Sequence, residues 1–115
     1  MKSGNLRLVQ SIAGRGSDFA QLLAEHKLDQ KGQVLPHIFM GEVVQWAIEA
    51  AAAKRFGEIA DLFAFLESEF AQDESIRELI AVSFLENLPH ASEPEGSLRD
   101  LLGPHLREEL ERLEA

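Results

Sequence analysis

The chain has 115 residues, of which 45% are apolar and 27% charged, and it carries a formal net charge of −9. This length and composition fit one globular domain with a single core and exclude a disordered chain. The excess of acids argues against nucleic acid or a membrane surface as partner, because both are bound through basic patches. The absence of cysteine excludes disulfides, thiolate metal sites and thiol nucleophiles. The N-terminus shows no apolar signal segment, so we expect a cytoplasmic protein.

The first half of the chain shows helical spacing of its apolar residues. Ser17 and Asp18 form a helix-start signal and Gly32 a helix-end signal, which predicts a helix over residues 18–28. We expect residues 1–16 to be only loosely ordered; whether residues 6–13 form an earlier helical turn stays open. Pro36 suits the first turn of a longer helix over residues 36–55. This second helix is apolar on two sides, which is typical of a central element with neighbours packed around it.

The second half continues the helical pattern. The spacing of apolar residues predicts a third helix over residues 58–72 and a fourth over residues 74–88, which Pro89 ends. Residues 89–96 contain two prolines and a glycine and are predicted to form a loop. A short turn is expected from Ser97, followed by a last helix that begins at Pro104.

No window of the sequence alternates in the way that a strand requires. The pattern therefore predicts an all-α fold, a compact antiparallel bundle of about five helices around the central apolar helix. We expect residues 1–115 to form a single helical domain. The last helix carries an apolar stripe of Leu106, Leu110 and Leu113. This stripe makes a homodimer one of the alternatives.

Between residues 56 and 98 there are ten acidic residues and only Arg77 as a base, so this segment carries the whole charge imbalance. Concentrated negative potential can steer a basic partner to one region of a surface. The predicted partner-binding residues occupy the third helix and the start of the fourth. They are Glu58, Asp61, Phe65, Glu69, Asp73 and Glu74, with Glu93 and Glu95 as flanking charge. Phe65 is interpreted either as an exposed anchor among carboxylates or as a residue buried against a neighbouring helix.

A second group of residues could form a pocket between the central and fourth helices. Glu42 and Glu86 interrupt apolar faces, where a carboxylate is either desolvated or paired with a donor. Should they converge, they could work as acid and base or hold a cation; otherwise they lie at the core edge, hydrogen-bonded to neighbours. The candidate pocket residues are His37, Glu42, Trp46, Glu86 and Asn87.

The sequence contains no further catalytic signal. No serine lies in a nucleophile elbow, and no two histidines have the helical spacing of metal ligands. We therefore predict no catalytic residue, no metal ligand and no cofactor, and we consider an enzyme less favoured than a binding protein.

Three blocks of the sequence carry a resemblance. They are LPHIFMGE at residues 35–42 with Trp46 after it, AVSFLENL at residues 81–88, and LLGP at residues 101–104. Together they resemble a family of small, acidic, all-helical bacterial proteins without an established activity. Similar small acidic proteins occur beside polymorphic toxin genes and act as immunity proteins. The resemblance covers residues 18–113, rests on core residues and helix signals, and implies no catalytic residues.

Two hypotheses from different classes follow. The first is a non-catalytic, immunity-like binding protein that neutralises a basic protein partner, such as a toxin domain, through its acidic face. The alternative is a small-molecule or metal-dependent enzyme that uses His37, Glu42 and Glu86 in an interhelical pocket.

Overall fold

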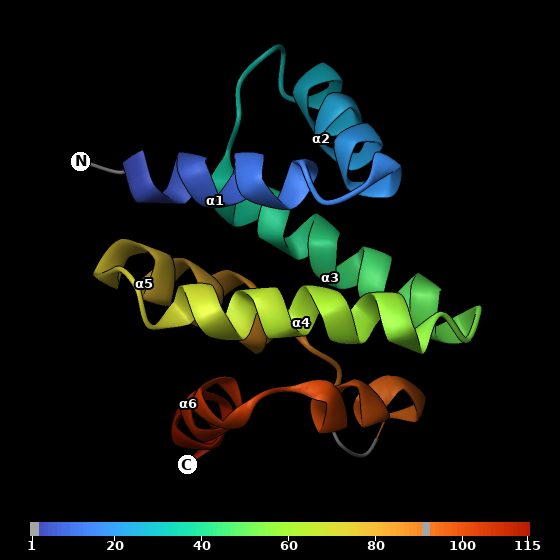
Figure 1. Ribbon diagram of the computed structural model, residues 1–115, viewed down its shortest axis with the longest axis vertical. Helices are drawn as coiled ribbons and strands as arrows, with labels where there is room; N and C mark the ends of the chain where they lie inside the picture. Colours follow the sequence, from blue (N-terminus) through green and yellow to red (C-terminus); the bar gives the residue numbers. More distant parts are fainter. Residues whose placement is uncertain (1–2, 91–92) are drawn as a thin grey trace.

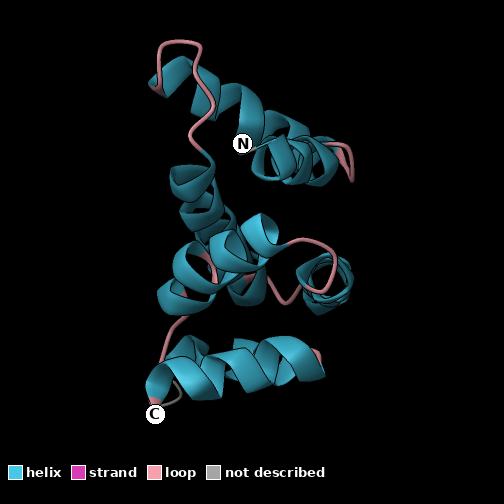
Figure 2. Ribbon diagram, turned by 90° about the vertical axis from the view of Figure 1, so that its left-hand side faces the viewer, coloured by secondary structure: helices cyan, strands magenta, loops and turns pink. Residues whose placement is uncertain are grey.

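The computed structural model describes residues 3–90 and 93–115, and these residues are helical with no strand. The helices are α1 (Ser3–Ala13), α2 (Ser17–Asp29), α3 (Pro36–Ala52), α4 (Phe56–Phe70), α5 (Glu74–Ser83) and α6 (Pro104–Glu114), with 3₁₀ segments η1 (Leu85–Asn87) and η2 (Pro94–Leu101). Figures 1 and 2 show α1 and α2 at one end, α6 and η2 at the other, and α3, α4 and α5 between them. The predicted all-α class is confirmed, and the antiparallel order of the bundle stays a prediction.

The N-terminal segment differs from the expectation of a loosely ordered stretch. From Ser3 onward it forms α1, and the side chains of Leu8, Val9 and Ile12 are completely buried. Their spacing places them on one face of the helix, which packs against α2, α3 and α5. Gly14 directly follows this helix, at the turn that leads to α2. Residues 1 and 2 lie outside the described part of the chain.

The connection from α2 to α3 reverses the chain at Lys31 and Gly32, whose φ angles are 57° and 87°. A glycine adopts this left-handed conformation without steric cost, which is why helices so often end at one. The Gly32 N–H donates to the carbonyl of Lys27 at 2.7 Å and closes the end of α2. Gly32 thus has the helix-ending role that the sequence predicted.

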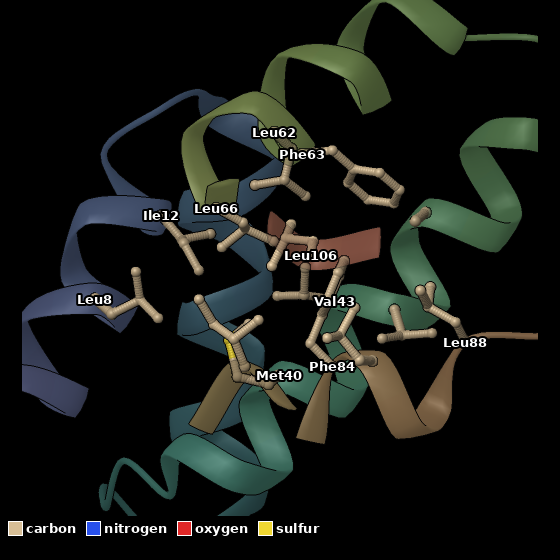
Figure 3. Packing of buried hydrophobic residues seen from close by; sticks show 14 of the residues in the cluster. Leu8, Ile12, Met40, Val43, Leu62, Phe63, Leu66, Phe84, Leu88 and Leu106 are labelled. Carbon is tan, nitrogen blue, oxygen red and sulfur yellow. The ribbon is translucent and has the colours of Figure 1, made fainter. Parts of the chain in front are cut away.

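The central helix α3 contacts α1, α2, α4, α5 and η2. Two sides of it are apolar, and its buried side chains are Phe39, Met40, Val43, Val44, Ala47 and Ala50. Around it, Phe63 of α4 and Phe84, which lies between α5 and η1, add aromatic rings to the core; the two rings meet edge to face with centroids 5.3 Å apart. Figure 3 shows this core, with Met40 and Val43 between residues of the surrounding elements. Each large side chain buried in this way contributes about 1.5–3 kcal/mol.

The helix predicted over residues 74–88 is interrupted. α5 ends at Ser83, and the chain continues as the tighter η1. The side-chain amide of Asn87 donates to the Ser83 carbonyl at 2.8 Å, whereas the Asn87 backbone N–H donates to the Phe84 carbonyl. A side chain has therefore replaced the backbone donor that would continue an α-helix.

The loop predicted over residues 89–96 is shorter in the structure, because η2 begins at Pro94. Leu98 and Leu102 are buried, and they attach this segment to the core. Residues 91 and 92 of the predicted loop lie outside the described residues.

The N-terminus of α6 has no cap from its own chain segment. Its free backbone N–H groups are instead bound by Glu67 of α4, which accepts from Leu106 at 3.0 Å and from His105 at 2.9 Å. The His105 ring also contacts this carboxylate, at 2.5 Å. Gly103 permits the approach, because a Cβ there would lie 2.6 Å from the Glu67 carboxyl carbon. A long-range contact thus supplies the cap that α6 lacks.

The apolar stripe of α6 lies inside the molecule. Leu106 and Leu110 are buried, and Leu113 packs against the same core. The stripe therefore packs within the chain, and a homodimer stays an untested prediction.

Leu8 and Leu6 offer a matched test of α1, because Leu8 is completely buried and Leu6 is 44% exposed in the same helix. We expect Leu8→Ala to lower the free energy of unfolding by about 2–5 kcal/mol, through lost burial and the cavity it leaves. Leu6→Ala should cost about 0.5 kcal/mol or less. Urea unfolding of the two variants measures both values. Equal small losses would mean that α1 is not part of the folded core.

Glu67 should make the stability of the protein depend on pH. Burial alone would raise the pKa of Glu67, but hydrogen bonds from Leu106 and His105 together lower it below its ordinary value. A lowered carboxyl pKa contributes stability above the unfolded-state pKa and loses it as pH falls through the folded-state pKa. We expect Glu67→Gln to cost about 1 kcal/mol near pH 7 and progressively less in acid. Thermal unfolding at a series of pH values measures this loss of stability, with Glu108→Gln, a change at an exposed acid, as control. A loss that stays constant across pH would contradict the role of the Glu67 carboxylate.

Candidate functional site

Arginines from outside residues 56–98 neutralise part of the predicted acidic face. Arg55 binds Glu58 with N–O distances of 2.6 and 2.8 Å, and Arg7 of α1 binds Glu69 at 3.2 Å. The side chain of Glu69 is also largely covered, with 17% of it exposed. The fold therefore supplies the positive charges that the segment itself lacks, and this face is less negative than its sequence suggests.

Phe65 lies between the two interpretations made from the sequence. It is partly buried and packs against the core, and the Arg15 guanidinium lies 4.6 Å from the centre of its ring. Arg15 also donates to the backbone carbonyl of Asp61 at 3.4 Å. The ring already has a cation on it, so Phe65 is not an open anchor for a partner's cationic side chain.

The remaining residues of the face divide into two kinds. Asp73 is the N-cap of α5, and its carboxylate accepts from the N–H groups of Ser75 and Ile76 at 2.7 and 3.2 Å. Asp61 and Glu74 have exposed side chains. Of the flanking acids, Glu93 accepts from the N–H of His90 at 2.8 Å, and the side chain of Glu95 is outside the described part of the structure.

The residues of the predicted pocket do not converge. His37 and Asn87 meet at Ser83, where the His37 ring is 2.5 Å from the hydroxyl and the Asn87 amide holds the backbone carbonyl. Glu42 and Trp46 face α2 instead, and Glu86 is exposed on a separate hollow between η1 and α6. The alternative based on His37, Glu42 and Glu86 therefore lacks the shared pocket that it requires.

His26 is the partner of Glu42, and the sequence analysis assigned it no role. Its side chain is fully buried, Nε2 accepts from the N–H of Leu35 at 3.0 Å, and Nδ1 lies 3.0 Å from Glu42 Oε1. Because Nε2 is an acceptor, the ring proton is on Nδ1 and is donated to the carboxylate. This pair fixes α2, the following turn and α3 relative to one another. It also directs Glu42 to the side of α3 that α2 covers.

Beside this pair there is a hollow between α2 and α3, with a volume of about 310 Å³. Of the described residues that line it, four are acidic and none is a lysine or arginine. The lining residues are Leu22, Glu25, His26, Asp29, Glu42, Gln45, Trp46 and Glu49. The carboxylates of Glu25 and Glu49 accept only neutral amide donors, from Gln21 and Gln45, at 3.1 Å each. We call this region the α2–α3 hollow.

Helical spacing contained a signal for this hollow. Glu25 and Asp29 are four residues apart on α2, and Glu42 and Glu49 are seven apart on α3, so each pair shares one helix face. The two faces meet only because α2 folds back over α3. The comparison of acids and bases along the sequence did not single out these four acids, because the residues outside 56–98 contain as many bases as acids.

One edge of the α2–α3 hollow is held by Arg55. It binds Asp18 of α2 at 2.6 Å as well as Glu58 of α4, and the Trp46 indole N–H lies 3.4 Å from the Asp18 carboxylate. The Arg55 guanidinium also lies 5.9 Å from the centre of the Trp46 ring. The centre of the Phe19 ring lies 4.5 Å from the centre of the Trp46 ring. Hydrogen bonds from Arg55 lower the pKa of Asp18 and of Glu58 below their ordinary values. Trp46 is thereby held in one orientation at the border of the hollow.

None of the helices described is long and apolar enough to cross a membrane. In the same part of the chain, no three His, Asp or Glu side chains are grouped so that they could hold a metal ion.

The fold and these surfaces define an all-helical protein whose acidic side chains gather in distinct regions. Residues 11–115 match the model of a family described as a domain of unknown function, DUF7674, and the chain belongs to that family. Neither the curated proteins nor the solved structures contain a match to this chain. The expected membership of a family without an established activity is confirmed. The description of the family therefore gives no activity that could be assigned to this chain.

Arg55→Gln tests the network beside the hollow. We expect the pKa values of Asp18 and Glu58 to rise toward their ordinary values, because each loses its main hydrogen-bond donor. The variant should be less stable above the unfolded-state carboxyl pKa, and its deficit should shrink as pH falls and both carboxyls become protonated. Carbon-detected NMR titration measures the pKa values, with exposed Lys27→Gln as control. Unchanged Asp18 and Glu58 titrations in Arg55→Gln would mean that the bridge is not formed in solution.

Proposed function

We propose that this protein is a non-catalytic binding protein of the immunity type, which neutralises a basic protein partner such as a toxin domain. The carrying observation is the α2–α3 hollow, where four carboxylates and Trp46 share the lining and no described lining residue is a lysine or arginine. Side chains that do chemistry together would have to share a site, and the candidates of the enzyme alternative are divided between separate places. The resemblance to acidic immunity proteins supports the same class of function.

The hollow has the chemistry to receive a lysine or arginine side chain from the partner. Leu22 and Trp46 offer apolar surface for an aliphatic stem, and the carboxylates of Glu25 and Glu49 are exposed at the rim. Long cationic side chains bind well where their stem is buried and their charge stays at a polar edge. Complementary charge increases the rate of encounter, whereas the packed aromatic residue slows dissociation.

The α4 face that the sequence predicted is the weaker candidate surface. Glu58, Glu69 and Asp73 are already engaged by Arg55, Arg7 and the N-terminus of α5. Binding a partner there would have to break ion pairs or a helix cap within the chain, whereas Glu25 of the hollow accepts only from the neutral amide of Gln21. Asp61 and Glu74 remain exposed on that face and provide a matched control.

The test compares two charge reversals of equal size. Glu25→Lys/Glu49→Lys alters the α2–α3 hollow, and Asp61→Lys/Glu74→Lys alters the α4 face by the same charge. Each tagged variant and the unaltered protein captures partners from cells of the native organism, and the affinity for the captured protein is then measured at two salt concentrations. We expect the hollow variant to bind at least about tenfold more weakly, since two close charge pairs become repulsive. The α4 variant should bind almost as well as the unaltered protein.

Three results would contradict this proposal. Equal loss in both variants would indicate attraction by net charge rather than a site. Loss in the α4 variant alone would move the site to the face that the sequence predicted. Retention of the partner by both variants would remove both acidic surfaces from consideration.

A further inference from the structure

Arg99 of η2 is the least exposed of the arginines that form ion pairs in the described residues, with 15% of its side chain accessible. Its Nε donates to the backbone carbonyl of Pro89 at 2.7 Å. Its two terminal nitrogens donate to the two carboxylate oxygens of Glu114, at 2.8 Å each. Because the Nε contact is made to the backbone, it holds the guanidinium plane in position whether or not Glu114 is bound. The result is a preformed bidentate donor for a carboxylate.

A hollow of about 410 Å³ lies next to this donor, between η1, η2 and α6. Half of its lining residues are leucines, namely Leu85, Leu88, Leu110 and Leu113. His90 and Glu86 complete the lining together with Arg99 and Glu114. The volume of this hollow lies in the range of sites that bind small molecules, and the hollow combines leucines with polar groups that could orient a ligand. The proposed function leaves this hollow unused, because α6, which lines it, lies at the opposite end of the molecule from α2 (Figure 1).

Glu114 is well placed to be displaced from Arg99. It is the last residue of α6, its side chain is 40% exposed, and helix ends open more easily than their middles. If another carboxylate replaced that of Glu114, the two hydrogen bonds from the terminal nitrogens of Arg99 would be kept. Only the last turn of α6 would have to move. Glu114 therefore has the position of an internal competitor for the Arg99 donor.

We propose that Arg99 and the adjoining leucines form a binding site for a small monocarboxylic acid with an apolar tail, and that Glu114 occupies its carboxylate position in the free protein. The guanidinium binds the carboxylate, and the tail replaces water on the partly exposed Leu113 at the edge of the leucine cluster. Glu86 lines the hollow, and the charge of Glu93 acts on Arg99. These two acids disfavour ligands with more than one negative charge, which is why the ligand class is a monocarboxylate.

The test removes the internal competitor. Glu114→Ala is titrated with hexanoate by calorimetry, beside the unaltered protein and Glu111→Ala, an exposed acid of the same helix. The Glu114 carboxylate is attached to the same chain as Arg99 and therefore competes as though it were present at millimolar concentration. Without it, Glu114→Ala should bind hexanoate at least about tenfold more tightly than either control. Hexanol lacks the carboxylate and should not bind, and acetate lacks the tail and should bind more weakly than hexanoate.

The location of binding is measured in the same variant. On addition of hexanoate, the NMR signal of the Arg99 Nε–H and the methyl signals of Leu85 and Leu113 should shift together and saturate at one ligand per chain. This readout needs no substitution of Arg99, whose loss could disturb the fold. The proposal is overturned if Glu114→Ala binds hexanoate no better than Glu111→Ala, if hexanol binds as well as hexanoate, or if the shifts lie elsewhere.

Discussion

The burial of α3 on two sides is the constraint on which the other elements depend. A helix with apolar residues on more than one side cannot remain at a surface, so α1, α2, α4, α5 and η2 all make contact with it. The polar groups of α3 are placed by the same packing. Glu42 is intermediate in exposure and lies on the side that α2 covers, where His26 donates to it. The shape of the α2–α3 hollow thus follows from how the core is built.

Charge in this protein is arranged by contacts between distant residues rather than by position along the chain. Acids of residues 56–98 find arginines from α1 and from the start of α4, and Glu67 binds the N-terminus of α6. These pairs leave the four acids of the α2–α3 hollow with one buried neutral histidine and two amides as neighbours. Unbalanced charge next to an accessible aromatic ring is the arrangement that favours a cationic partner.

Much of the fold could be predicted from local patterns, because Pro36, Gly32 and Pro104 mark helix ends through their backbone chemistry alone. What local patterns could not supply were contacts between residues far apart. His26 and Glu42 are 16 positions apart in the sequence. Glu67 and the α6 residues that it caps are at least 38 positions apart, and Arg15 and Phe65 are 50 apart. Whether residues 6–13 form a helix stayed open for a related reason, since the apolar face of α1 becomes informative only once its neighbours are known. The candidate site depended on such contacts more than the fold did.

The most direct test of the account follows the emission of Trp46, the only tryptophan of the chain, which lines the α2–α3 hollow. A short arginine-rich peptide is titrated into the protein at low and at physiological salt. The account predicts a saturable change in emission that weakens with salt, is lost in Glu25→Lys/Glu49→Lys and persists in Asp61→Lys/Glu74→Lys. An emission that does not change with the peptide, or that changes equally in both variants, would contradict the claim that this hollow binds cationic side chains.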